Sequence, residues 1–202
     1  MNASQTNYRQ MDDSTLIQKI KNGDLPAIRE LVDNHKNLIW HIIISMAGRN
    51  SDNEDLFQEV FLRVFKGIRS FRADSRLSTW IGSITHHVCV DYLRKKKKKS
   101  ALVEYDADFK PVISMVSDGT WNRNDNGDIK RLLMAAIANL NPDFRTVITL
   151  YHLDEHSYKD IAEITGMPEG TVKSYISRAR LKLREMLTAA VPDMAEIISD
   201  FC

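Results

Sequence analysis

Residues 157–185 read SYKDIAEITGMPEGTVKSYISRARLKLRE, and this stretch carries the strongest structural signal in the chain. A short helical pattern is followed by a glycine-containing turn and a longer helical pattern, which is the order of a helix-turn-helix. Gly166 permits the left-handed backbone angle of the turn, and Ala162 is small enough to let the helices approach. Four apolar residues have the spacing to close a small shared core: Ile161, Ile164, Val172 and Ile176.

The second helical pattern of this stretch is strongly basic. No acidic residue occurs between Thr171 and Arg184, which suits a helix lying against phosphates in the major groove of DNA. A solvated basic helix in a bundle is the alternative, and the complete helix-turn-helix pattern argues against it. Lys and Arg pair naturally with the acceptor atoms of guanine. The residues expected to contact DNA are Thr171, Lys173, Ser174, Ser177, Arg178 and Arg180.

Helical patterns also precede this stretch, from residue 129 onward. In the sequence NPDF, Asn141 is a predicted N-cap and Pro142 occupies the first helical position, where its missing N–H costs nothing. We therefore predict a second helical domain over residues 129–190. The tail, residues 191–202, is interpreted as either a packing helix or a partner-binding helix.

Four helical segments are predicted in the first hundred residues. The first can be capped by Asp13 or Ser14 and stops at Gly23, and the second spans residues 25–47. Ser51 and Glu54 have the spacing of a capping box, which predicts a third helix from about Asp52. That helix and the fourth carry apolar stripes at three- and four-residue steps, at Leu56, Phe57, Val60, Val64 and Ile68, and at Leu77, Ile81, Ile84 and Val88.

The predicted fold class is all-α, because no strand-like alternation persists along the chain. We expect two small helical domains joined by a flexible linker, with residues 1–99 as the first domain and residues 100–128 as the linker. Five consecutive lysines, residues 95–99, follow directly behind the predicted end of the fourth helix. The linker is rich in Asn, Asp and Gly, which favour turns over helices.

The formal net charge of +1 conceals a segregated charge pattern. Residues 1–100 contain 17 Lys and Arg against 11 Asp and Glu, a balance of +6, whereas the linker contains two basic and six acidic residues, a balance of −4. An extended linker of this composition cannot recover its ordering entropy by burying apolar surface. We therefore expect the free protein to bind DNA poorly and a partner to hold the linker in place.

Several classes of protein are disfavoured by composition. The N-terminus lacks the build of a signal peptide, and the longest apolar run is too short to span a bilayer, so we expect a cytoplasmic protein. Cys89 and Cys202 are interpreted as free thiols. His86, His152 and His156 are interpreted as surface histidines, and no metal or other cofactor is expected. A nuclease is disfavoured because clustered carboxylates or metal ligands are lacking.

Two blocks of the sequence together resemble a known family. Residues 54–97, EDLFQEVFLRVFKGIRSFRADSRLSTWIGSITHHVCVDYLRKKK, look like region 2 of the extracytoplasmic-function (ECF) sigma factors. Residues 140–185 resemble region 4 of the same family, and the resemblance covers most of residues 12–187. It implies a subunit without covalent chemistry that docks on bacterial RNA polymerase core through the beta-prime clamp helices and the beta flap. It also implies promoter DNA as a partner and allows for an anti-sigma factor.

The resemblance assigns roles to residues of the first domain. The family's motif for binding core polymerase, DLxQExxxR, falls on the third predicted helix. In the family, region 2 opens the minus-10 promoter element, and region 4 recognises the minus-35 element. His87 stands where a smaller polar residue such as Asn is more usual, and Trp80 is equally well interpreted as a packing residue. The expected polymerase contacts are Asp55, Gln58, Glu59, Leu62 and Arg63, and the expected minus-10 contacts are Arg76, Trp80, Ser83, His87, Arg94, Lys95 and Lys96.

The lysine run is interpreted as a phosphate clamp beside the minus-10 contacts, since it lies at the C-terminal end of a helix, where cations complement the helix dipole. The alternative function is a conventional helix-turn-helix regulator, whose first domain would dimerise or sense a signal. Such a protein would bind duplex DNA without being a polymerase subunit.

Overall fold

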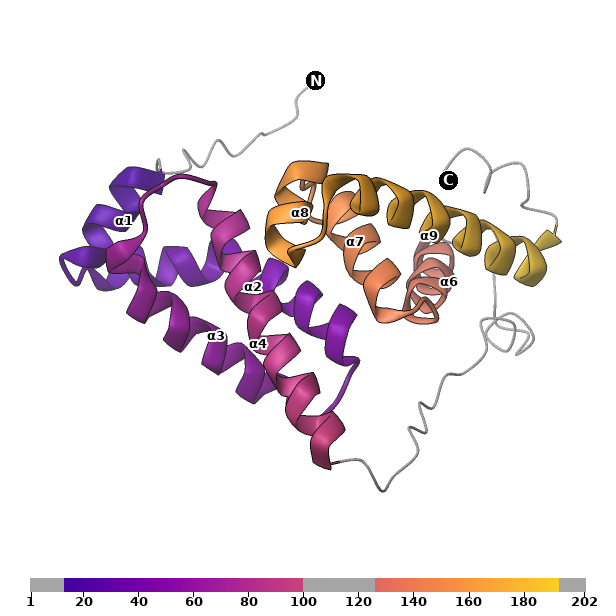
Figure 1. The fold of residues 1–202 in the computed structure, drawn as a ribbon, viewed down its shortest axis with the longest axis horizontal. Helices are drawn as coiled ribbons and strands as arrows, with labels where there is room; N and C mark the ends of the chain where they lie inside the picture. Colours follow the sequence, from indigo (N-terminus) through magenta and orange to yellow (C-terminus); the bar gives the residue numbers. More distant parts are fainter. Residues whose placement is uncertain (1–12, 100–125, 193–202) are drawn as a thin grey trace.

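The computed structural model describes residues 13–99 and 126–192, and within these ranges it contains eight α-helices, one short 3-10 helix and no strand (Figure 1). The all-α prediction is confirmed. The predicted linker, apart from its last residues, and most of the predicted tail lie outside the described residues. The N-terminal half comprises α1 (Asp13–Lys21), α2 (Leu25–Ala47), α3 (Asn53–Gly67), η1 (Ile68–Ser70) and α4 (Leu77–Lys99). The C-terminal half comprises α6 (Asn126–Ala138), α7 (Pro142–His152), α8 (Tyr158–Thr165) and α9 (Glu169–Ala190).

Most helix boundaries follow from local capping. The carboxylate of Asp24 accepts a hydrogen bond from the Ala27 N–H at the start of α2, and Asn141 caps α7 in the same way, as predicted. Ser157 and Asp160 form a capping box at the start of α8. Gly166 ends α8 with φ of 72°, in the left-handed region expected for it.

The predicted capping box between Ser51 and Glu54 is wrong. The residue that precedes α3 is Asp52, and no side chain caps this helix. The Asp52 N–H is already bonded at 2.9 Å to the Asn50 side chain, and the Ser51 hydroxyl turns toward the Asp52 carboxylate at 3.4 Å. Glu54 and Asp55 lie in the first turn instead, where their charges complement the helix dipole.

The N-terminal half packs α2, α3 and α4 around one apolar core. The predicted stripe of α3 is buried except for Phe57, which is half-buried and stacks on Trp40 of α2 at 4.8 Å between ring centroids. The predicted stripe of α4 is likewise buried except for the half-buried Ile84. Full burial of one such side chain stabilises the fold by about 1.5 to 3 kcal/mol.

The lysine run belongs to α4 and does not follow it. The helix continues through Lys99, so the prediction that it ends before the lysines is wrong. Lysine is a good helix former, and cations in the last turns are favoured by the helix dipole. The Lys96 ammonium reaches back one turn to the Tyr92 hydroxyl at 3.3 Å. The run is therefore a rigid extension of the helix that carries His87.

The C-terminal half has the predicted helix-turn-helix. Ile161, Ile164, Val172 and Ile176 are all buried, and together they join α8 to α9. The ring of Phe144 on α7 meets Tyr175 of α9 edge-on at 5.1 Å between centroids. α7 thus supports the helix-turn-helix from one side.

The two halves pack directly against each other, which the sequence did not lead us to expect. α7 lies along α2, and α8 lies along α4 (Figure 1). The Arg145 guanidinium of α7 donates to the Ser45 carbonyl of α2 at 2.7 Å, and the Thr79 hydroxyl of α4 donates to the Asp160 carboxylate of α8 at 3.0 Å. None of the described helices is long and apolar enough to cross a membrane.

Candidate nucleic-acid and polymerase interfaces

The outward face of α9 carries the predicted duplex-binding residues. Lys173, Ser177 and Arg178 are exposed, while Thr171, Ser174 and Arg180 are half-buried, and Val172 and Ile176 face inward as expected. The Ser174 hydroxyl donates to the Thr171 backbone carbonyl at 2.9 Å, so the Ser174 side chain is partly committed to the first turn of the helix.

Two cations of this face are held over a pair of tyrosines. Tyr151 and Tyr158 stack in parallel at 5.0 Å between centroids. The Lys173 ammonium lies 5.6 Å from the Tyr158 ring centroid, and the Arg180 guanidinium lies 5.4 Å from that of Tyr151. The hydrogen bond between Lys173 and Glu169, at 2.8 Å, raises the pKa of the lysine. These contacts orient the two cationic side chains at the surface of α9.

The three histidines considered as surface residues differ in their surroundings. His152 is exposed and lies 3.1 Å from Arg180, and its pKa is lowered by partial burial and by that guanidinium. His156 is only 5% exposed, so its assignment to the surface is wrong, and His86 is half-buried. His156 is buried because the loop before α8 turns inward, where α8 meets the first half of the molecule. The described residues contain no group of three side chains that could hold a metal ion.

The predicted polymerase-binding residues lie on the outer face of α3. Asp55, Gln58 and Arg63 are exposed, Glu59 is half-buried, and Leu62 is 54% exposed although it is apolar. The Arg63 guanidinium donates to Glu59 at 2.8 Å and to Asp91 of α4 at 3.5 Å. These two bonds fix the arginine between α3 and α4, and they leave Leu62 open to a partner.

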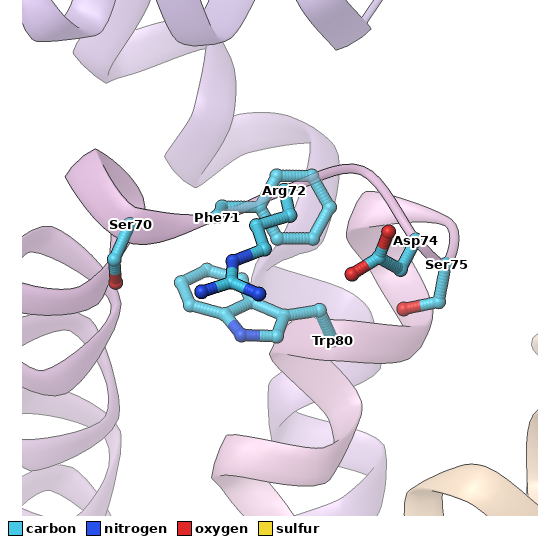
Figure 2. A pocket seen from close by; sticks show the side chains of 6 residues that line it. All are labelled: Ser70, Phe71, Arg72, Asp74, Ser75 and Trp80. Carbon is cyan, nitrogen blue, oxygen red and sulfur yellow. The ribbon is translucent and has the colours of Figure 1, made fainter.

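A pocket of about 210 Å³ opens beside the start of α4. It is lined by the connection from η1 and by one side of Trp80, whose ring meets that of Phe71 at 5.0 Å between centroids (Figure 2). Ala73 in this connection has φ of 58°, a strained conformation for a residue with a Cβ and one that clusters at binding sites. The pocket combines aromatic rings, a cation and small polar groups: Ser70, Phe71, Arg72, Asp74, Ser75 and Trp80.

Among the residues that line this pocket, only Trp80 was an expected minus-10 contact. The available signal for the pocket was the aromatic pair Phe71 and Trp80. These residues are nine positions apart, a separation that helical spacing does not bring into contact, so their contact was not predicted. Gly67 completes the arrangement, since a Cβ there would lie 3.0 Å from the Trp80 ring. Trp80 therefore both packs and lines an open site.

The other predicted minus-10 residues divide into two groups. His87, Arg94 and Lys95 are exposed toward the C-terminal end of α4, and Arg94 lies 3.9 Å from Asp91. Arg76 is exposed but lies 4.0 Å from Asp160 of α8, and Ser83 is half-buried. One end of the predicted stripe on α4 is therefore exposed to solvent, and the other end contacts the C-terminal half of the molecule.

Comparisons with known proteins agree with this geometry. Residues 31–99 match the family model described as Sigma-70 region 2, and residues 130–183 match Sigma-70, region 4. The chain is 34% identical over 177 residues to the ECF RNA polymerase sigma-E factor of Haemophilus influenzae, with 85% of this chain and 93% of that protein covered. It is 33% identical over 176 residues to the ECF RNA polymerase sigma factor SigW of Bacillus subtilis, with 85% and 94% covered.

A solved structure has a similar fold over most of the chain. The sigma factor RpoE of Bartonella quintana, solved in complex with the anti-sigma factor NepR, superposes with a TM-score of 0.60 at 26% identity, covering 80% of this chain and 96% of that one. The two family models match region 2 and region 4 in the order in which the two surfaces occur here. This protein therefore belongs to the ECF sigma factors of the sigma-70 family, which are transcription initiation factors.

Proposed function

We propose that this chain binds RNA polymerase core and directs it to promoters by using two DNA surfaces of different chemistry. The observation that carries the proposal is the pairing of an exposed cationic helix, α9, with an aromatic-lined pocket on a separate half of the chain. A cationic helix suits the major groove of duplex DNA. A pocket with ring faces suits a base that has left its stack. A conventional helix-turn-helix regulator has no use for the second surface.

At the minus-35 element, α9 is the proposed recognition helix. Its exposed Lys173 and Arg178 are placed to reach guanine acceptors, while Arg180 faces the phosphate backbone from the tyrosine pair. Contacts to base edges discriminate between sequences, whereas phosphate contacts contribute affinity at every sequence.

At the minus-10 element, the pocket beside α4 is the proposed site for an unstacked base. Phe71 and Trp80 offer ring faces, and Asp74 and Ser75 offer polar atoms for the edge of a base. Unstacking costs a few kcal/mol, which stacking in the pocket offsets. His87 lies two turns further along α4, where we place the next stretch of the non-template strand.

The basic end of α4 is proposed as a phosphate clamp. Because Lys95, Lys96 and Lys97 lie within one continuous helix, their charges are displayed in a fixed direction from the base pocket. Neutralising the run should weaken binding at all sequences and flatten its salt dependence, because fewer counterions would be released.

The outer face of α3 is the proposed docking site for the clamp helices of polymerase, with Leu62 as its apolar centre. An anti-sigma factor is a second proposed partner, because the similar Bartonella structure is a complex with one. No covalent chemistry is proposed for the chain, and its proposed location is the cytoplasm, where polymerase acts. These assignments make it a non-enzymatic subunit.

The test is to add the purified protein to RNA polymerase core and to measure transcription from promoter fragments selected from genomic DNA. We expect promoter-dependent transcripts only when protein and core are both present. Arg72→Ala should lower open-complex formation more than closed-complex binding, while Arg69→Ala, an exposed cation just outside the pocket, should change neither. Footprinting of duplex DNA without core and without any gain in transcription would overturn the proposal.

A further inference from the structure

The outward face of α9 changes its chemistry halfway along the helix. Its first half carries the predicted DNA contacts, whereas its second half forms a shallow groove of about 480 Å³. All the residues that line the groove come from α9, and they recur at three- and four-residue steps, which places them on one side of the helix. We call this surface the α9 groove, and its lining residues are Leu181, Arg184, Glu185, Thr188 and Ala189.

The α9 groove faces away from the rest of region 4. α6 and α7 pack on the opposite side of α9, where Leu183 and Leu187 are buried (Figure 1). Leu181 is 57% exposed at one end of the groove, and Ala189 is exposed at the other. These apolar groups stand between charged ones, and a groove of this kind suits the apolar face of an amphipathic helix.

Residues 193–202, DMAEIISDFC, follow α9 in the sequence and have the pattern of such a helix. Asp193, Glu196 and Asp200 recur at steps of three and four, and no lysine or arginine occurs in the segment. The large apolar residues have the spacing i, i+3, i+4 and i+7, which lines one face of a helix: Met194, Ile197, Ile198 and Phe201. The pattern predicts a helix with an apolar face and an acidic face beside it.

The end of α9 allows the chain to turn back over the groove. α9 ends before Val191, whose side chain is buried, and Pro192 lacks the N–H that a continued helix needs. The groove extends for about 12 Å along α9 from Leu181 to Ala189, and a helix of the length of residues 193–202 extends for about 15 Å. A helix over this segment, antiparallel to α9, therefore covers the groove from end to end.

The charges of the segment and of α9 are complementary. Arg178, Lys182 and Arg184 are exposed on α9, and Glu185 is the one acidic residue in its sequence after Thr171. The segment carries three acidic residues and no basic one. Coulomb attraction between opposite charges therefore favours the segment over a neutral helix as the occupant of the groove.

The α9 groove continues the line of the predicted DNA contacts. Ser177, Leu181 and Arg184 are spaced by four and three residues, so the groove begins one turn beyond Ser177. Carboxylates held in this position repel DNA phosphates, and they pair with cations that the phosphates would otherwise meet. An occupied groove is therefore expected to oppose duplex binding.

We propose that residues 193–202 fold back as a helix and occupy the α9 groove of the same chain. The apolar face of the segment covers Leu181, and its acidic face lies beside the cations of α9. Docked in this way, the segment weakens the binding of duplex DNA by region 4. The competition with DNA rests on the proposed function, whereas the docking itself does not.

A spin label on Cys202 tests the docking in the full chain. Cys89 does not compete for the label, because it is buried and burial raises the pKa of its thiol to about 12. We expect the label to broaden the amide NMR signals of the α9 groove, and we expect the signals of exposed α2 residues such as Arg29 to stay sharp.

Two pairs of variants make this measurement specific. Leu181→Ser in the groove and Ile198→Asp on the apolar face of the segment should each remove most of the broadening. Leu153→Ser changes another exposed leucine of region 4, and Ser199→Asp adds the same charge on the polar side of the segment, so both should retain it. Equal broadening in all four variants would overturn the docking.

A mixture of chains distinguishes docking within one chain from contact between two copies. Isotope-labelled Cys202→Ser protein is mixed with spin-labelled protein that carries no isotope. We expect the isotope-labelled chain to keep sharp signals in the α9 groove. Broadening of these signals in the mixture would show that the segment docks on a second copy, and it would overturn the proposal.

Removal of residues 193–202 tests the competition with DNA. Duplex binding by the free chain should become at least about threefold tighter, the size expected when exposed opposing charges are removed. Leu181→Ser should act in the same direction, and Leu153→Ser should have no effect. Docking without any gain in duplex binding after truncation would overturn the competition. Failure of the unmodified chain to support promoter-dependent transcription with core would overturn the proposed function and would leave the docking result unchanged.

Discussion

Helix α8 has two sides that pack against different partners, and the contrast between them explains how the molecule is organised. Toward α9, Ile161 and Ile164 join Val172 and Ile176 in a dry apolar core. Toward α4, the contacts include the Thr79–Asp160 hydrogen bond, the Arg76–Asp160 ion pair and one close approach at Gly82. The first side holds the C-terminal half together, and the second joins the two halves of the molecule.

Asp160 shows how closely the two roles are combined. It completes the capping box of α8 with Ser157 and accepts the Thr79 hydrogen bond from the other half of the molecule. Burial alone would raise its pKa, but the hydrogen bonds from Ser157 and Thr79 outweigh this effect and lower it. Its charged form therefore stabilises the fold at neutral pH, and that contribution is lost as pH falls below the ordinary value near 4.

The largest effect is expected in the apolar core of region 4. Ile176→Ala should lower the free energy of unfolding by about 2 to 5 kcal/mol, because it leaves a cavity at a side chain that is 1% exposed. Chemical denaturation followed by circular dichroism measures the loss. A loss below about 1 kcal/mol would show that α8 and α9 do not form a tight core.

The exposed face of α9 should affect binding and leave stability unchanged. Lys173→Ala and Arg178→Ala are each expected to weaken minus-35 binding of the holoenzyme by about 1 to 3 kcal/mol. Lys36→Ala is a matched control, because that lysine also pairs with a neighbouring acid at 2.8 Å but lies on α2. Equal weakening by the control variant would contradict the assignment.

The contact between the two halves should respond more weakly than the core. Thr79→Val removes one hydrogen bond between the halves, worth about 1 kcal/mol, and should raise the pKa of Asp160, which that bond lowers. Thr85→Val is the control, since Thr85 is equally buried on α4 but bonds within its own helix. Titration of the Asp160 carboxyl by NMR should show the rise in pKa for Thr79→Val only. The same rise in both variants would count against the contact.

The smallest effect is a dependence on pH. The hydrogen bond to Asp154 raises the pKa of His41 above 6.5, so the pair stabilises the fold at pH values below 6.5 and loses this contribution as pH rises through the raised value. The free energy of unfolding of the unmodified protein should exceed that of His41→Gln by more at pH 6 than at pH 8.5. The difference should be under about 1 kcal/mol, because the histidine is partly exposed.

His87→Gln serves as the control for loss of an exposed histidine. Because the other titratable groups near the contact between the two halves, including His35, His156 and Asp160, are present in both proteins, their contributions cancel in the comparison. A difference between the unmodified protein and His41→Gln that grows with rising pH would contradict the His41–Asp154 pairing.

Much of the fold was predictable because the signals are local. The extent of α2, the cap at Asn141, the turn at Gly166 and the apolar stripes all depend on residues within one or two turns of each other. The inward and outward faces of α9 follow from the same periodicity. Sequence reasoning erred at Ser51, because the Asp52 N–H bonds to the Asn50 side chain and no side chain caps α3. It also erred at the lysine run, because nothing in five lysines stops a helix.

The contacts between the two halves and the pocket were not predictable, because each depends on residues that meet only in three dimensions. Arg145 contacts a carbonyl 100 positions away, and Asp154 reaches His41 across 113 positions. Apart from Trp80, none of the residues that line the pocket was among the expected contacts, since no periodicity marks a loop. The burial of His156 likewise follows from packing between the two halves, which neither half reveals by itself.

The central claim is that two surfaces of different chemistry, the cationic face of α9 and the pocket beside α4, act at different promoter elements. The direct test compares Arg178→Ala with Arg72→Ala in closed-complex binding and in open-complex formation by the holoenzyme. We predict that Arg178→Ala lowers closed-complex binding, whereas Arg72→Ala lowers open-complex formation more than closed-complex binding. Equal effects of the two variants on both steps would contradict the account.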